Sequence, residues 1–103
     1  DVPLSSLLSP VYVYLKNHNE SLLDQMAAVM AGKLRAVFGN RVLGPDKPPV
    51  ARIQTLFIKK IVVKIEQNAP MGRARELLLR IQREMIEDER YKSLIVYYDV
   101  DPM

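Results

Sequence analysis

The sequence contains no cysteine and no tryptophan, has a single histidine, and lacks any long apolar run. Without cysteine it can form neither a disulfide framework nor a thiolate metal site, as expected of a protein in a reducing cytoplasm. No apolar stretch approaches the ~18 residues of a membrane span, and no signal peptide is recognisable. We therefore expect a cytoplasmic domain with no membrane segment.

The composition is that of one ordinary globular domain. The chain has 103 residues, of which 49% are hydrophobic and 26% charged, so it can bury a single core and has no signature of disorder. Residues 1–10 lack a clear hydrophobic period, and we expect them to be an arm or a junction that precedes a domain over residues 11–103. Because the chain begins with Asp1 rather than methionine, we also expect it to be a piece of a longer protein.

Positive charge is concentrated in the middle of the chain. The formal net charge is only +3, but residues 33–64 contain eight lysines and arginines against Asp46 alone, which gives +7 there and −4 elsewhere. A basic block of this kind is a candidate surface for binding a polyanion. It could equally be a solvated face with no ligand.

Hydrophobic periodicity predicts four strands and two helices. Alternation indicates strands over residues 11–16, 41–43, 52–66 and 93–101. Spacings of three and four indicate one helix that follows the Asn17-His18-Asn19 turn and ends at Phe38, and a second helix over residues 74–88. Gly39-Asn40 is a suitable stop for the first helix, and prolines in residues 44–49 should interrupt strand pairing.

This order of elements, β-α-β-β-α-β, predicts an α+β fold of the ferredoxin-like class: a four-stranded antiparallel sheet with two helices on one face. The first and third strands would then lie at the centre, and one parity of their side chains would lie on the uncovered face. That face would carry two tyrosines and three lysines, joined by Ile95 and Tyr97: Tyr12, Tyr14, Lys16, Lys60 and Lys64. Rings that stack on bases and ammonium groups that neutralise phosphates suit a nucleic acid. The same face could instead pack against another domain.

Two motifs, one for RNA binding and one for nucleotide binding, are incomplete in this sequence. An RNA-recognition domain should carry aromatic residues on its third strand, whereas residues 57–66 read FIKKIVVKIE, with aliphatic residues at those positions. Gly39 to Gly44 has the glycine spacing of a P-loop, but Pro45-Asp46 follow where lysine and serine or threonine are needed. We therefore expect no nucleotide-phosphate site in this chain.

The titratable residues predict no catalytic or metal site. His18 is isolated in a turn without ligand spacing, and we expect it on the surface. The carboxylates Glu84, Glu87, Asp88 and Glu89 sit among Arg80, Arg83 and Arg90 and form i,i+4 pairs with them that typically decorate an exposed helix. Asp99 and Asp101 share a strand face. Such a pair could form a weak cation site, but it is more often only an acidic end of a strand.

Two segments resemble one known family. Residues 41–53 read RVLGPDKPPVARI, and the chain ends with YDVDPM. They resemble the C-terminal domain of the bacterial replication-restart helicase PriA (primosomal protein N-prime), and the resemblance extends over nearly the whole chain, from Val11 to Met103. The best-matched positions are Leu43-Gly44-Pro45, Pro49, Ala51-Arg52, Ile61 and Asp99-Val100-Asp101-Pro102.

The resemblance implies a domain that helps to recognise branched or forked DNA. The helicase motor, with ATP and magnesium, and a zinc-binding cysteine-rich region would lie elsewhere in the parent protein, so this domain would be no enzyme and hold no cofactor. Phosphate contacts would come from basic residues without base reading, and two tyrosines are further DNA-binding candidates: Lys47, Arg52, Lys59, Lys60, Lys64, Tyr12 and Tyr14. Arg52 lies in the family motif and is the first candidate among them.

Relatives also bind the acidic tail of single-stranded DNA-binding protein with an arginine near the start of the second helix, and Arg73 is the nearest match. The chain departs from the family pattern at Leu56 to Lys60, where many relatives have an Arg-aromatic-Arg-Trp-Gln run; here only the two lysines could supply that charge.

Two other interpretations remain open. The chain could be an interaction domain whose open face and proline loop dock other domains of the parent helicase or single-stranded DNA-binding protein, with little DNA binding of its own. A small-molecule-sensing domain of the same topology is a third interpretation. DNA binding by the isolated chain at low salt distinguishes the first two functions.

Overall fold

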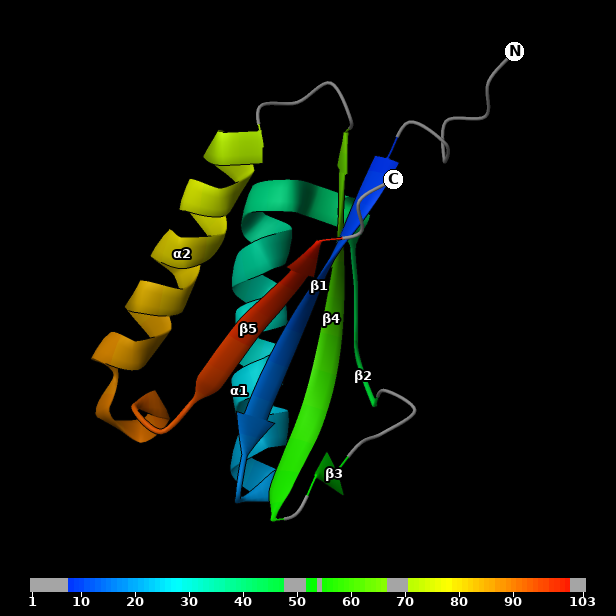
Figure 1. The fold of residues 1–103 in the computed structure, drawn as a ribbon. Helices are drawn as coiled ribbons and strands as arrows, with labels where there is room; N and C mark the ends of the chain where they lie inside the picture. Colours follow the sequence, from blue (N-terminus) through cyan, green and yellow to red (C-terminus); the bar gives the residue numbers. More distant parts are fainter. Residues whose placement is uncertain (1–7, 48–51, 54, 67–70, 101–103) are drawn as a thin grey trace.

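The structure is a computed structural model that describes residues 8–47, 52–53, 55–66 and 71–100. Its elements follow the predicted order, with three short additions (Figure 1). They are β1 (Leu8–Asn17), α1 (Glu20–Phe38), the 3-10 turn η2 (Gly39–Arg41), β2 (Val42–Asp46), β3 (Arg52–Ile53), β4 (Leu56–Glu66), α2 (Met71–Glu87), the 3-10 turn η3 (Glu89–Tyr91) and β5 (Ile95–Val100).

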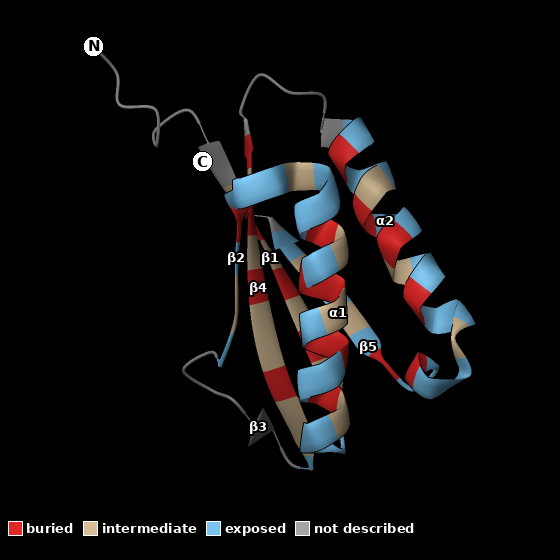
Figure 2. Cartoon of the chain, turned by 180° about the vertical axis from the view of Figure 1, so that it is seen from behind, coloured by how far each residue is buried: buried red, intermediate tan, exposed pale blue. Residues whose placement is uncertain are grey.

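The sheet has the strand order β2-β4-β1-β5, every pair is antiparallel, and β3 pairs with the start of β4. Both helices lie on the same side of it (Figure 1), and Figure 2 shows them from that side. The predicted ferredoxin-like α+β fold is therefore confirmed. No helix of the described residues lies on the opposite side of the sheet, and we call that side the open face.

Several boundaries differ from the prediction. Strand β1 begins at Leu8, inside the segment expected to be an arm, and residues 1–7 lie outside the described part of the chain. The single strand predicted from Arg52 onward is wrong, because the chain reverses between Ile53 and Leu56 and β3 pairs back onto β4. The sequence there, Gln54-Thr55, has none of the glycine, asparagine or proline residues that usually signal a tight hairpin.

Helix α1 is defined by its caps and its buried stripe. The side chain of Asn19 accepts a hydrogen bond from the Leu22 amide at 3.1 Å and so caps the N-terminal end of the helix. The helix ends at Gly39, whose φ of 68° is a left-handed conformation and whose amide donates to the Arg35 carbonyl. Between these ends, one face is buried against the sheet: Leu23, Met26, Ala27, Met30, Ala31 and Leu34.

The core lies between the helices and the sheet (Figure 2). Alternate residues of the two central strands point into it, as the sequence predicts: Val11, Val13, Leu15, Ile61, Val63 and Ile65. Helix α2 covers the other half with Ala74, Leu78, Ile81 and Met85. This parity fixes which side chains of β1 and β4 are left for the open face.

Polar contacts of two side chains, Asn17 and Tyr98, hold the sheet and its surroundings together. Buried Asn17, at the end of β1, donates to the carbonyl and hydroxyl oxygens of Ser93 at 3.2 and 3.0 Å and so anchors the entry to β5. The Tyr98 hydroxyl donates to Gln82 Oε1 at 2.7 Å and lies 3.3 Å from the Leu78 carbonyl oxygen, which ties β5 to α2. Burial raises the pKa of Tyr98 to about 12.

Candidate nucleic-acid interface

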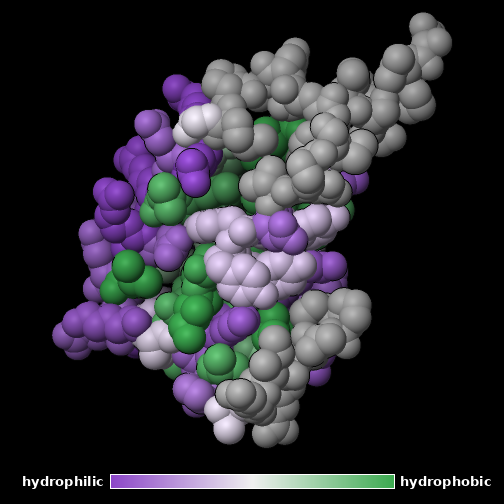
Figure 3. All heavy atoms as spheres, viewed as in Figure 1, coloured by the Kyte–Doolittle hydropathy of each residue, from purple (hydrophilic) through white to green (hydrophobic). Residues whose placement is uncertain are grey.

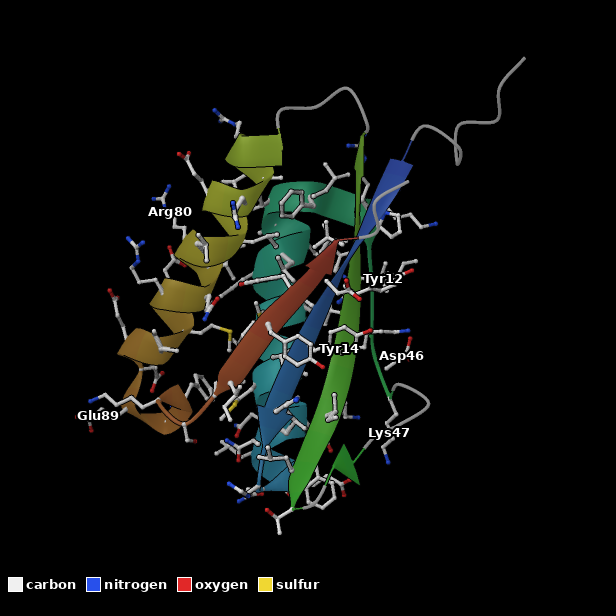
Figure 4. The ribbon with its side chains drawn as sticks, viewed as in Figure 1. Tyr12, Tyr14, Asp46, Lys47, Arg80 and Glu89 are labelled. Carbon is white, nitrogen blue, oxygen red and sulfur yellow. The ribbon has the colours of Figure 1, made fainter. Side chains whose placement is uncertain are left out.

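Tyrosine and lysine side chains gather on the open face, over the middle of the sheet. Strand β1 contributes Tyr12 and Tyr14, which Figure 4 shows in front of the ribbon, on the side away from the helices. Strand β4 contributes Lys60, which pairs with Tyr14 in the register, and Lys64. Figure 3 shows this face as pale side chains of intermediate hydropathy, bordered by hydrophobic and charged groups.

The rings and ammonium groups are in mutual contact. Tyr14 and Tyr97 are direct neighbours across β1 and β5, and their rings stack with centroids 4.8 Å apart and an interplanar angle of 16°. Lys16 Nζ lies 4.7 Å from the centre of the Tyr97 ring, and Lys60 Nζ lies 5.4 Å from the centre of the Tyr12 ring. These cation–π contacts hold two positive charges over an aromatic surface and restrict their motion.

Two carboxylates lie in the same cross-strand rows of the sheet as residues of the tyrosine and lysine cluster. Asp46 of β2 pairs with Lys60, and Asp99 of β5 pairs with Tyr12. The pKa of Tyr14 is raised by its partial burial first and by the nearby Asp99 charge second. The open face thus carries both signs, with positive charge at Lys16, Lys60 and Lys64.

Two further lysines predicted to contact DNA lie near acidic residues of α1 instead. Lys59 has the opposite parity to Lys60, so it points toward the helices, where its Nζ lies 2.9 Å from Asp24 Oδ1 and its side chain is only 16% exposed. Lys47, just beyond β2, is well exposed and lies 3.9 Å from Glu20 Oε2. An exposed pair at that distance is weak and leaves Lys47 able to reach a ligand, whereas Lys59 is held by the shorter contact.

Two candidates remain, Arg52 and Arg73. The backbone of Arg52 opens β3, but its side chain is outside the described residues. Arg73 is exposed in the first turn of α2, on the helical side of the molecule. The structure thus brings together Tyr12, Tyr14, Lys60 and Lys64, while Lys47, Lys59 and Arg73 lie elsewhere.

Several charged side chains in the described ranges form ion pairs with one another. No group of three histidine, aspartate or glutamate side chains that could hold a metal ion occurs within the described ranges. In the acidic segment after α2, hydrogen bonds from Arg90 lower the pKa of Asp88 to about 2. The Glu84 carboxylate lies 3.8 Å from Arg80 and 3.6 Å from Lys33, so it joins α2 to α1. His18 Nδ1 lies 3.1 Å from the Thr55 hydroxyl.

Three features of the site were not predicted from the sequence. The stack of Tyr97 on Tyr14 required the register between β1 and β5, which periodicity does not supply. The register shifts at Gly44-Pro45, where we expected an interruption, but β2 then resumes and pairs Asp46 with Lys60, which we did not expect. Arg35 was not singled out, yet its Nη2 donates to the Gly44 carbonyl oxygen at 2.6 Å and anchors this strand to α1; no sequence signal indicated that contact.

Comparison with known proteins gives the fold and no family. No family model matches the chain, and no curated protein matches it significantly. Among solved structures, a de novo designed protein, Foldit4, matches with a TM-score of 0.65 and 11% sequence identity, over 93% of this chain and 98% of that one. At that identity the similarity concerns the fold alone. Within the described part of the chain, neither helix combines the length and the apolar character needed to cross a bilayer.

Proposed function

We propose that this chain is a DNA-binding domain of a replication-restart helicase of the PriA type, and that its open face contacts branched or forked DNA. The observation that carries the proposal is the cluster of lysines and tyrosines on the face of the sheet that no helix covers. The resemblance of residues 41–53 and of the chain end to that helicase family supplies the biological setting.

The lysines of the open face are placed to follow a phosphate backbone. Lys60 and Lys64 share one face of β4 four residues apart, which separates their Cα atoms by about 13 Å at the rise of an antiparallel strand. Lys16 lies on the neighbouring strand, in register with Ile58. These point charges neutralise phosphates without reading bases, which suits recognition by shape and charge.

The tyrosines add an aromatic surface on which bases of a nucleic acid can stack. A base stacked on an aromatic side chain contributes about 1–3 kcal/mol, so even one such contact would measurably strengthen binding. The Tyr14–Tyr97 stack also gives the middle of the face a fixed shape. ATP hydrolysis, magnesium and zinc belong to other parts of the parent protein in this proposal, and its setting is the bacterial cytoplasm.

A second candidate function is protein docking, and the apolar rim of the same face favours it. Leu43 on β2 and Ile95 on β5 are each 46% exposed at opposite sides of the lysine and tyrosine cluster. Such a face fits another domain of the parent helicase or single-stranded DNA-binding protein. Arg73, on the helical side, is a separate candidate contact for an acidic tail. Under this function the isolated chain binds little DNA.

A charge-reversal experiment distinguishes the two functions. The double variant Lys60→Glu/Lys64→Glu replaces two positive charges on the open face with two negative ones. The control Arg75→Glu/Arg83→Glu makes the same change in net charge at exposed positions of α2. We expect the first variant to bind a labelled fork at least tenfold more weakly at low salt and to lower the slope of log affinity against log salt by about 2, because each lost phosphate contact removes about one unit.

The matched variant on α2 should keep most of the affinity. Equal losses in both variants would mean that binding follows net charge rather than the open face. Unchanged affinity in Lys60→Glu/Lys64→Glu would remove these two lysines from the interface.

A further inference from the structure

The two edges of the sheet differ in how they are protected from pairing. At one edge, β2 shifts register between Leu43 and Asp46 and contains Pro45, which has no amide hydrogen to donate. At the other edge, β5 stays in regular register with β1 over six consecutive residues and contains neither proline nor glycine. A bulge and a proline are devices that blunt an edge strand, and β5 has neither.

The outer side of β5 therefore offers backbone groups for another strand. In an antiparallel strand, alternate residues direct their amide and carbonyl groups to opposite sides. Among the strands that the structure describes, β5 pairs with β1 alone, so half of its backbone groups point away from the sheet. Only one of its six side chains, Asp99, is charged, and there is no lysine on the strand to discourage pairing.

Contacts on both faces hold β5 in an extended conformation. On the helix side, the Tyr98 hydroxyl is bonded to Gln82 of α2. On the open face, Tyr97 stacks on Tyr14. A strand that is already ordered loses little conformational entropy when it pairs, which favours association through its edge.

We propose that β5 pairs antiparallel with β5 of a second copy of this chain, about a two-fold axis at Tyr97, so that the two sheets become one. An antiparallel strand is complementary to itself under two-fold rotation, so the same surface serves both partners. The pairing goes beyond DNA binding and does not depend on it.

Charge selects the register. With Tyr97 opposite the second Tyr97, each Asp99 lies opposite Ile95 of the other copy, in the same row of the joined sheet as that copy's Lys16. The long lysine side chain can approach this carboxylate across the apolar Ile95, and the symmetry creates the contact twice. A register centred on Tyr98 would place Asp99 opposite Tyr97 instead, in a row without Lys16.

The paired strands would join the two open faces into one continuous surface with twice the number of lysines and tyrosines. The contact itself is small, because six residues bury less than the ~800 Å² per partner of a standard interface. We therefore expect a reversible dimer whose population depends on concentration.

Sedimentation equilibrium of the full chain without DNA, over a range of concentrations, tests the pairing. In the proposed register Ile95 lies opposite Asp99 of the other copy, so Ile95→Glu places two like charges directly opposite each other. Leu43→Glu places the same charge at an equally exposed position of the opposite edge, since both side chains are 46% exposed. We expect the wild-type chain and Leu43→Glu to dimerise alike, and Ile95→Glu to weaken the dimer at least tenfold while it keeps the wild-type circular dichroism spectrum.

A wild-type chain that remains monomeric at every concentration would overturn the proposal. A dimer that survives Ile95→Glu, or one that both variants weaken equally, would also overturn it, because association would then not involve the β5 edge specifically. The register has its own test: Lys16→Asp and Asp99→Lys should each weaken the dimer, and the double variant should restore it.

Discussion

Gly44 lies where β2 passes close to the backbone of β4. Its φ is +100°, a conformation that side chains rarely adopt, and a Cβ built there would lie 2.9 Å from the Lys60 carbonyl oxygen and 3.2 Å from the Asp46 amide nitrogen. The Gly44 carbonyl also accepts the hydrogen bond from Arg35. Gly44 thus fixes the position of β2, the strand that places Asp46 opposite Lys60.

Gly44→Ala should therefore destabilise the protein by about 2 kcal/mol, through backbone strain and displacement of β2. Gly32→Ala is the matched control, because Gly32 lies inside α1 and nothing lies within 4 Å of its added Cβ. That change should stabilise the protein by about 0.5–1 kcal/mol, since alanine favours a helix interior. Urea unfolding measures both, and two substitutions with the same sign would contradict this account of Gly44.

At the scale of elements, the sheet and the helical layer are joined at β5 and α2 by the Tyr98 hydroxyl. Periodicity predicts that Tyr98 points inward, because it alternates with Tyr97 along the strand. It cannot predict that the hydroxyl meets Gln82, since that contact depends on the rotation of α2 about its axis. The same limit applies to Lys59: its parity differs from that of Lys60, but its 2.9 Å contact with Asp24 depends on how α1 lies on the sheet.

Tyr98→Phe should lower the free energy of unfolding by about 1 kcal/mol at neutral pH, because one partly buried hydrogen bond is lost. The substitution should also change the dependence on pH. The folded-state pKa of Tyr98 is raised from 10.0 to about 12, so its contribution is complete below pH ~10 and is lost as the pH rises toward 12.

The wild-type protein should therefore lose stability between pH 10 and 12 more steeply than Tyr98→Phe. Other tyrosines and lysines titrate in the same window, so the quantity to measure is the difference in unfolding free energy between the two proteins at each pH. A difference that stays constant across the window would show that burial of this hydroxyl does not favour its neutral form.

For the whole molecule, the order and the alternation of the apolar residues are enough to predict the layers and the open face. Val11, Val13 and Leu15 are buried as expected, and Tyr12 and Tyr14 lie on the other side of β1. Ile58 is an exception: it shares the parity of the open face but is only 4% exposed, so that face is not open along its full length. The return of β2 to pairing at Asp46, after the register shift at Gly44-Pro45, depends on a long-range register that no local pattern specifies. The β3 hairpin is local, but its Gln54-Thr55 turn carries no usual turn residue.

The central claim, that the open face contacts DNA, is tested most directly by fluorescence anisotropy of the wild-type chain. The titration uses a labelled forked DNA and a linear duplex of the same length, each at low and at moderate salt. We expect binding that favours the fork and falls steeply as salt rises, because positioned lysines displace counterions from phosphates. Absence of binding to either DNA at low salt would contradict it and would assign the open face to protein docking.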